Sequence, residues 1–187
     1  MKIEAPTKII PAFNNLKTNA FDIVVMEGGR GGAKSEALAA LGILESFIDD
    51  GVILCCREIQ KSIADSLYAT IVSTIYKYEL QSYFKIIQGE ITNNLTGSRF
   101  IFAGLKSNIT SIKSINKLRV VLTDEAENIT DNSWSYLRPT PRYGQVRFYV
   151  VFNPRFEHDA TWQQFIVNKD DRTLHITINW HDNPWFP

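Results

Sequence analysis

A glycine-rich octapeptide near the N-terminus constrains the fold of this 187-residue chain more than any other feature. It follows the apolar run 21–26, FDIVVM, and precedes a segment of helical character over 36–47. Its residues are Gly28, Gly29, Arg30, Gly31, Gly32, Ala33, Lys34 and Ser35. Strand, glycine loop and helix in this order are the context of a phosphate-binding P-loop, whose pattern is G-x-x-x-x-G-K-[ST]. The sequence therefore predicts a phosphate site at the edge of an α/β sheet.

The loop has the groups that bind a nucleotide. Its backbone N–H groups and the following helix N-terminus favour phosphate. We expect Lys34 to reach the β- and γ-phosphates and the Ser35 hydroxyl to bind Mg²⁺. Ala33 stands where the pattern has glycine, and its methyl group is compatible with a negative φ but strains the loop at a positive φ. For the loop alone, the alternative is a glycine-rich turn that binds nothing.

A second motif lies further along the chain, where the apolar run 120–123 ends at Asp124 and Glu125. A buried strand delivers its C-terminal residues to the sheet edge where α/β proteins bind ligands. We therefore expect Asp124 to hold Mg²⁺ together with Ser35, and Glu125 to orient or deprotonate the attacking water. An acidic pair alone is typical of a solvated loop, but after a P-loop it is a Walker B motif and favours a nucleotide hydrolase.

The remaining pattern alternates strands and helices. Apolar or alternating runs predict further strands at 52–56, 84–87, 90–93, 99–102, 146–152 and 174–178. A helical stripe within 58–78 consists of Ile59, Ile63, Leu67, Ile71 and Ile75. The sequence thus predicts a P-loop NTPase fold of the RecA/ASCE-like α/β class, with a mostly parallel central sheet flanked by helices and a short antiparallel extension. We expect 1–20 to be a polar lead-in and 21–180 the ATPase domain.

Composition excludes several other classes. Formal net charge is zero and 44% of the residues are hydrophobic, as in an ordinary globular domain. No apolar run approaches the ~20 residues that span a bilayer, so no membrane partner is expected. Cys55 and Cys56 are adjacent, which disfavours a disulfide between them. They are the only two cysteines and no histidine lies near them in the sequence, which disfavours a zinc site.

Six segments together resemble the large terminase subunit of tailed double-stranded DNA bacteriophages. They are, in order, the loop 28–35, CREIQKSI at 56–63, FAGL at 102–105, SIKS at 111–114, DEAE at 124–127 and FNP at 152–154. The resemblance runs from about residue 20 to the end and covers the N-terminal ATPase half of that family. It implies an ATP-driven motor that uses Mg²⁺ and packages viral DNA into a procapsid.

The resemblance also assigns roles to single residues. It implies that Arg30 contacts the γ-phosphate and acts in catalysis beside Lys34 and Glu125. It makes Asn153 a nucleotide-sensing coupling residue, whereas the residues alone favour a turn residue before Pro154. Arg57 and Gln60 match a recurrent segment without an assigned role. A trans-acting finger that reaches a neighbouring subunit is expected at one of three positions, Lys113, Arg138 or Arg142.

Partners follow from the same resemblance. It implies a homo-oligomeric ring, commonly a pentamer, that sits on the portal of the procapsid and acts with a small terminase subunit. It also implies that the protein works in the cytoplasm of the infected bacterium and is not a stable part of the mature virion. The isolated domain is expected to be a monomer, and 181–187 to begin a linker to a C-terminal nuclease. Zero net charge predicts weak binding of double-stranded DNA by the domain alone. One local basic stretch consists of Lys106, Lys113, Lys117 and Arg119.

Two other functions remain open from the sequence. The DEAE segment at 124–127 is also similar to the DEAD-like box of helicases, which are P-loop DNA translocases. If Ala33 distorts the loop, the chain would instead be a nucleotide-binding interaction module that binds weakly and does not hydrolyse ATP.

Overall fold

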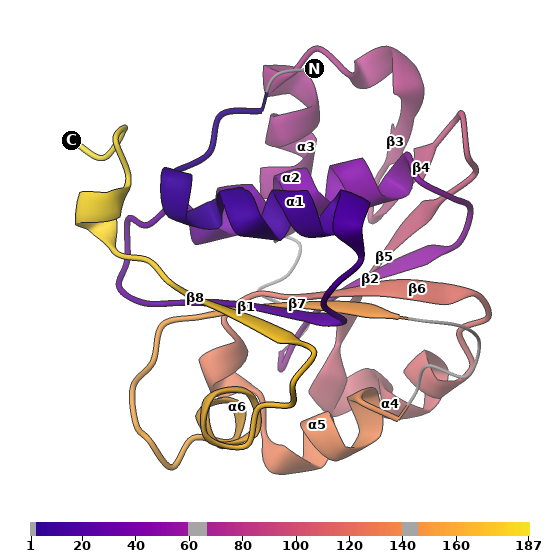
Figure 1. Cartoon of the computed structure of the whole chain (residues 1–187). Coiled ribbons are helices and arrows are strands. Elements are labelled where there is room, and N and C mark those ends of the chain that lie inside the picture. Colours follow the sequence, from indigo (N-terminus) through magenta and orange to yellow (C-terminus); the bar gives the residue numbers. More distant parts are fainter. Residues whose placement is uncertain (1–2, 60–66, 140–145) are drawn as a thin grey trace.

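Eight strands form one sheet through the centre of the computed structural model, which describes residues 3–59, 67–139 and 146–187 (Figure 1). Their spatial order is β3-β4-β5-β2-β6-β7-β1-β8. The bounds are β1 Ile23–Glu27, β2 Val52–Arg57, β3 Phe84–Ile87, β4 Glu90–Asn93, β5 Arg99–Gly104, β6 Leu118–Thr123, β7 Arg147–Phe152 and β8 Thr173–Thr177. Strands from β5 to β8 in this order pair parallel, and β3, β4 and β5 pair antiparallel. This confirms the expected mostly parallel sheet with an antiparallel extension.

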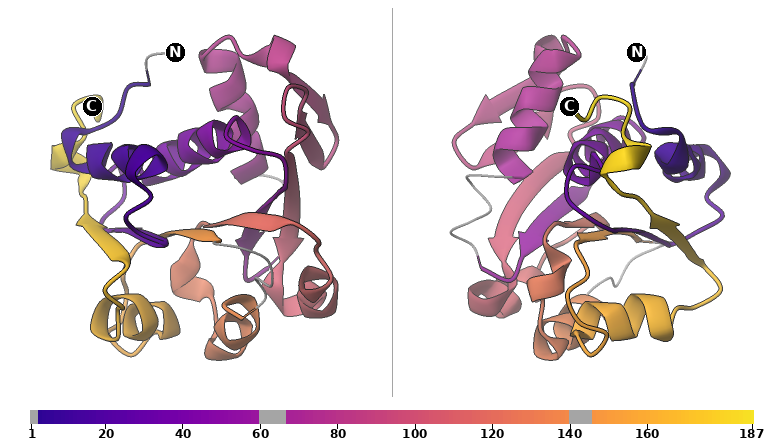
Figure 2. Two further views of the ribbon diagram at one scale, coloured as in Figure 1. Left: turned by 45° about the vertical axis from the view of Figure 1, so that its right-hand side comes forward. Right: turned by 90° about the vertical axis from the view of Figure 1, so that its left-hand side faces the viewer.

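Helices cover both faces of the sheet (Figures 1 and 2). On one face lie α1 Ile10–Thr18, α2 Lys34–Ser46 and α3 Ala69–Lys77; on the other lie α4 Leu105–Lys113, α5 Asp131–Leu137, α6 Ala160–Trp162 and the π-helical turn η6 Gln163–Val167. Short 3-10 turns are η1 Thr7–Ile9, η4 Gln81–Tyr83, η5 Ala126–Asn128 and η7 Trp180–Asp182. Two apolar cores result, since Val24 and Met26 pack on one face while Val25 packs on the other. Burial on both faces explains why β1 is a continuous apolar run.

Strand order determines which loops meet. Because β1 lies between β7 and β8, and β6 lies beside β7, the carboxyl ends of these four strands share one edge of the sheet. The glycine loop follows β1 directly, Asp124 follows β6 and Asn153 follows β7. Parallel pairing therefore gathers the sequence motifs at one place.

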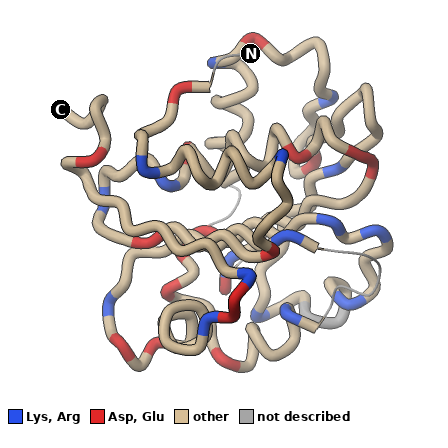
Figure 3. The backbone as a smooth tube through the Cα atoms, viewed as in Figure 1, with Lys and Arg blue, Asp and Glu red and all other residues tan. Residues whose placement is uncertain are grey.

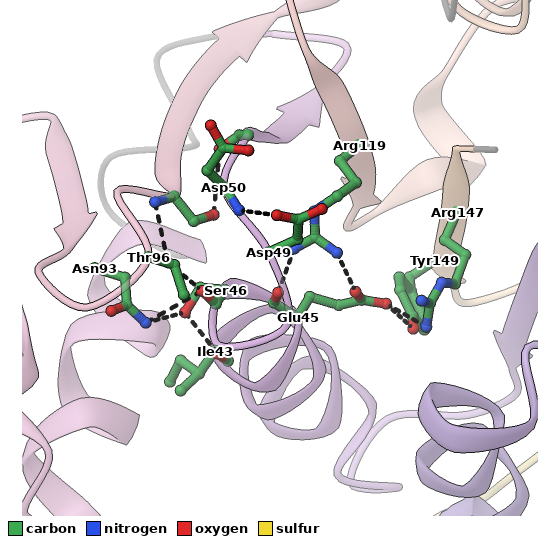
Figure 4. Close-up of polar contacts among 12 residues, drawn as sticks. Ile43, Glu45, Ser46, Asp49, Asp50, Asn93, Thr96, Arg119, Arg147 and Tyr149 are labelled. Atoms are coloured by element: carbon green, nitrogen blue, oxygen red, sulfur yellow. Dashed lines mark hydrogen bonds and ion pairs between the residues drawn. The ribbon is translucent and has the colours of Figure 1, made fainter. Parts of the chain in front are cut away.

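The far end of α2 is fixed by a buried carboxylate (Figure 4). Glu45 is fully buried, and its Oε2 accepts a hydrogen bond from Arg119 at 3.0 Å. Its Oε1 pairs with Arg147 at 2.8 Å and accepts from the Tyr149 hydroxyl at 2.7 Å. Burial, reinforced by the adjacent carboxylate, raises the pKa of Tyr149. The helix that begins at the glycine loop is thus anchored to the starts of β6 and β7.

The N-terminal segment differs from the expected polar lead-in. Residues 7–18 form η1 and α1, and Ile9 and Ala12 of these turns are fully buried in the core beneath the helices. Pro11 does not prevent the helix because it occupies the first turn, where no intrahelical N–H bond is lost.

The helical stripe is shorter than the sequence indicated. Leu67, Ile71 and Ile75 are buried as expected, but Ile59 is 58% exposed and lies before α3, and Ile63 lies outside the described residues. The tail packs on the domain, because η7 and the residues after it lie against the glycine loop. Among the described residues, no helix has the length and apolarity that crossing a membrane requires.

Candidate functional site

The glycine loop connects the buried end of β1 to the first turn of α2. Gly28 has φ +134° and Gly31 has φ +79°, both in the region that favours glycine. An added Cβ at Gly28 would stand 2.1 Å from the carbonyl oxygen of Ile178. The loop therefore follows its path because glycine allows both the backbone angles and the close approach to the end of β8.

The backbone of Ala33 decides between the negative and the positive φ that the sequence left open. Ala33 has φ 59° and ψ 24°, a left-handed conformation, and it precedes the first residue of α2. For a residue with a Cβ this conformation costs roughly 1–2 kcal/mol. The loop is closed at the expense of local strain.

Lys34 points back onto its own loop. Its side chain is buried, and Nζ donates to the carbonyl oxygens of Gly28 at 3.0 Å and Gly29 at 2.5 Å. Burial lowers the pKa of Lys34, and nearby carboxylates, led by Glu27 and then Glu127, oppose that shift. Among the described residues, the direct hydrogen-bond partners of this buried cation are neutral carbonyl groups, so it is suited to pair with an anion at the loop.

Ser35 and Asp124 are brought together from the two motifs. The Ser35 hydroxyl donates to Asp124 Oδ1 at 3.2 Å, although β1 and β6 are separated in the sheet by β7. Asp124 is buried, with 5% of its surface exposed. A hydroxyl and a carboxylate oxygen at this separation are the ligand types that Mg²⁺ prefers. The pair fits the magnesium position of a P-loop site.

Arg57 contacts both acidic residues that follow β6. One of its terminal nitrogens donates to Asp124 Oδ2, and the other lies 3.2 Å from Glu125 Oε2. Arg57 is buried at the end of β2, whereas the Glu125 side chain is 48% exposed and its backbone has φ +51°. The planar guanidinium reaches two carboxylates at once, which gives the unassigned arginine of the sequence a definite position. Gln60, its companion in that segment, lies outside the described residues.

Asn153 is connected to the acidic motif through Glu127, which sequence reasoning missed. The Asn153 N–H donates to Glu127 Oε2 at 3.2 Å, and Arg155 lies 3.6 Å from Glu127 Oε1. Burial raises the pKa of Glu127, and the N–H groups of its own backbone and of Asn153 oppose this shift. Asn153 Oδ1 is buried and has no hydrogen-bond partner within the described part of the chain. A third acidic residue in DEAE was the available signal, but spacing alone did not indicate its partner.

The site residues line one cavity of about 410 Å³. Its walls include the loop from Arg30 to Ser35, then Arg57, Asp124, Glu125 and Asn153. Arg30 is exposed at this wall. A neighbouring cavity of about 620 Å³ shares four lining residues with the first, namely Ala33, Glu36, Asn183 and Trp185. The two cavities therefore adjoin at these residues.

The three finger candidates do not line these cavities where they are described. Lys113 on α4 places Nζ 4.0 Å from the ring centre of Tyr136. Arg138 follows α5, lies over the ring of Phe165 and stands 3.7 Å from Asp170. Arg142 lies outside the described residues.

The expected basic stretch is divided by acidic partners. Lys117 pairs with Asp50 at 2.7 Å, and Arg119 pairs with Glu45. Figure 3 shows that basic and acidic residues are interspersed along the described backbone. These two cations are therefore neutralised by neighbours, and the stretch does not form a uniform basic surface.

Comparison with known proteins yields one family and several similar folds. The family model described as phage terminase large subunit matches residues 20–187. No curated protein sequence matches this chain. The large terminase of a thermophilic bacteriophage superposes with a TM-score of 0.84 at 10% identity, over 99% of this chain and 48% of that one.

Two further structures extend the comparison. The N-terminal domain of the DNA packaging ATPase from bacteriophage phi29 has a TM-score of 0.65 at 16% identity, over 89% of this chain and 94% of that one. The Escherichia coli DExH-box NTPase HrpB has a TM-score of 0.54 at 13% identity, over 95% of this chain and 22% of that one. At these identities the likeness shows a shared fold. The chain spans about half the length of the matched large terminase.

Proposed function

Because this chain belongs to the phage terminase large-subunit family, we propose that it is an ATPase unit that hydrolyses ATP with Mg²⁺ to drive double-stranded DNA into a procapsid. The observation that carries the proposal is the hydrogen bond from Ser35 to Asp124 beside the glycine loop, because it brings together the two motifs that we propose bind magnesium and the nucleotide. The matched terminase of the thermophilic phage has been solved with ADP and with ATP-gamma-S, which supports a nucleotide as ligand.

Each residue has a role in the proposed reaction. The backbone of the glycine loop and Lys34 bind the phosphates, and exposed Arg30 at the cavity wall adds positive charge near the γ-phosphate. Ser35 and Asp124 would hold Mg²⁺, which supplies charge neutralisation on the phosphate oxygens when bound. Glu125 orients the attacking water and takes its proton. In such phosphoryl transfer the protein contributes mainly positioning and charge stabilisation.

Coupling to movement is proposed to pass through Asn153. Its side-chain oxygen is buried without a partner in the described chain, and its N–H is bonded to Glu127 at 3.2 Å. A change at the γ-phosphate would therefore reach both the acidic motif and the end of β7. Movement of that strand end is the proposed start of the DNA-translocating step.

The test is ATP turnover with variants of the site. Lys34→Ala and Glu125→Gln should each abolish turnover, while Lys85→Ala on the exposed side of β3 should leave it unchanged. Near-normal turnover of either site variant would reject the assignment. Calorimetry with ATP and Mg²⁺ addresses the alternative: a chain that binds ATP without turning it over is a nucleotide-binding interaction module.

The assembly is proposed by family membership. We expect a homo-oligomeric ring, commonly a pentamer, acting with the portal, the procapsid and a small terminase subunit in the cytoplasm of the infected host. The matched phi29 genome packaging motor assembly supports an oligomeric machine. Interspersed charges (Figure 3) support weak DNA binding by a single copy, with avidity coming from the ring. The finger reaching a neighbour remains proposed at Lys113, Arg138 or Arg142.

The alternative function as a DNA translocase is that of a helicase. Its support is the likeness to the DExH-box NTPase HrpB, at a TM-score of 0.54 and over 22% of that protein. The family model favours the terminase over this alternative, because it matches residues 20–187 of the chain.

A further inference from the structure

The segment from Asn179 to the last residue lies against the glycine loop and bonds to its backbone. Asn179 Oδ1 accepts a hydrogen bond from the Gly29 N–H at 2.6 Å. Asn183 Nδ2 donates to the Gly31 carbonyl oxygen at 2.7 Å. The Phe186 ring packs on the same glycine, where an added Cβ would stand 2.4 Å from Phe186 Cε2. Two asparagine side chains thus hold two peptides of the loop.

The start of this segment is itself fixed. The Asn179 N–H donates to Asp182 Oδ2 at 3.0 Å, and together they form a capping box around η7. Lys8 of η1 pairs with Asp182 at 3.0 Å. The Asn179 N–H, and then Lys8, lower the pKa of Asp182, so this carboxylate stays charged. The segment that carries the two asparagines is therefore held in place by the capping box and by Lys8.

Asn183 connects the loop to an aromatic side chain. While its Nδ2 donates to Gly31, its Oδ1 accepts from the Trp185 N–H at 3.1 Å. Trp185 is 54% exposed and lines both the cavity at the glycine loop and the larger cavity beside it. One amide side chain therefore links the orientation of a loop peptide to the position of an indole ring between the two cavities.

From these contacts we propose that Asn183 is a positioning residue of the nucleotide site and that Trp185 contacts the nucleoside part of the bound nucleotide. The proposal rests on the proposed nucleotide-binding function of the same loop. A glycine loop binds phosphate through the direction of its N–H groups, so a side chain that fixes the Gly31 peptide fixes part of the anion site. An aromatic ring offers its face to a nucleobase, which is a flat π system. The larger cavity has the volume for a nucleoside, at about 620 Å³.

Asn183→Asp tests the positioning role with minimal change in shape. The carboxylate still accepts from the Trp185 N–H but does not donate to the Gly31 carbonyl oxygen. We expect the KM for ATP and the Kd for ADP to rise about tenfold or more, with a smaller change in kcat and a melting temperature within about 2 °C of the parent. The matched control is Asn168→Asp, because exposed Asn168 also donates to a main-chain oxygen, that of Gln163, at 2.9 Å. Equal KM and Kd values for the parent and Asn183→Asp would overturn the proposal.

Trp185 provides an independent measurement that does not need the Asn183 variant to fold. ADP titration should change the intrinsic fluorescence of the parent chain, and most of that change should be absent in Trp185→Phe, although three other tryptophans remain. A full signal and unchanged ADP affinity in Trp185→Leu and Trp185→Phe would refute the indole contact. Parent turnover separates the two levels: if the parent hydrolyses ATP while the Asn183 and Trp185 variants behave like it, only this inference fails. If the parent neither binds ADP nor hydrolyses ATP, the proposed function fails and this inference with it.

Discussion

Replacing Ala33 by glycine should stabilise the chain even though glycine generally lowers stability by enlarging the conformational freedom of the unfolded chain. Ala33 has φ 59° and ψ 24°, directly before the first residue of α2. The left-handed conformation costs an alanine roughly 1–2 kcal/mol, and glycine adopts it without that cost. The perturbation removes one methyl group from the loop and leaves every hydrogen-bonding group in place.

The expected gain is smaller than the strain that is relieved. Glycine enlarges the conformational freedom of the unfolded chain, which offsets about 0.4–1 kcal/mol. The half-buried methyl group of Ala33 contributes a further ~0.4 kcal/mol of burial that is lost. Taking the middle of each range, the net increase in the free energy of unfolding is about 0.4 kcal/mol. For a chain of 187 residues this raises the melting temperature by roughly 1–2 °C.

The assay is urea unfolding of Ala33→Gly beside Ala69→Gly, which places the same substitution at an exposed position in the first turn of α3. The control should lose about 1 kcal/mol, the ordinary cost of glycine in a helix. The changes in the free energy of unfolding of the two variants should therefore have opposite signs and differ by about 1.4 kcal/mol. A loss for Ala33→Gly as large as that for Ala69→Gly would refute the assignment of strain to the loop.

Three further predictions follow from the buried charges. Arg57→Met should lower the free energy of unfolding by about 3–5 kcal/mol. Arg57→Lys should keep most of the stability but reduce ATP turnover about tenfold or more, because an ammonium does not span Asp124 and Glu125 as a guanidinium does. Equal turnover of the lysine variant and the parent would contradict this. Glu45→Gln should cost about 3–5 kcal/mol in urea unfolding, because Arg119 and Arg147 lose their shared buried anion, and a loss under 1 kcal/mol would exclude that role. Because burial raises the pKa of Glu127, the folded chain binds the proton of this carboxyl more tightly than the unfolded chain, and stability falls as pH rises from about 4.5 through the folded pKa. Glu127→Gln should remove that component of the pH dependence. Superimposable stability–pH curves for the variant and the parent would rule it out.

The parts of the site that the sequence predicts are those built from adjacent residues. The octapeptide from Gly28 to Ser35 and the strand end at Asp124 are local patterns, and parallel pairing alone brings strand ends to one edge. The expected mostly parallel sheet was confirmed, because its strands are also local patterns of apolar residues. A side chain whose partner lies in another element has no such local signature.

Arg57, Glu127 and Asn183 illustrate this second kind of residue. Arg57 meets Asp124 across 67 positions, Glu127 meets Asn153 across 26, and Asn183 meets Gly31 across 152. Each is a single polar residue whose neighbours along the chain do not specify a partner. The helix at 10–18 was missed for a different physical reason, since prolines at 6 and 11 indicate a break but are compatible with the entry to a helix.

The anchoring of α2 restricts where the chain can move when a nucleotide changes. Its far end is tied through Glu45 to β6 and β7, and its first turn is tied through Ser35 to the residue after β6. A helix held to β6 at both ends, and to β7 as well at its far end, does not tilt against the sheet without breaking either the Ser35–Asp124 hydrogen bond or a buried ion pair of Glu45. Breaking such a buried pair costs several kcal/mol. The phosphate-dependent change should therefore be confined to segments beyond the strand ends, at Glu125, at Asn153 and at the stretch that begins with Asn179. Hydrogen exchange with and without ADP should show protection changes in those segments while the amides of α2 keep theirs.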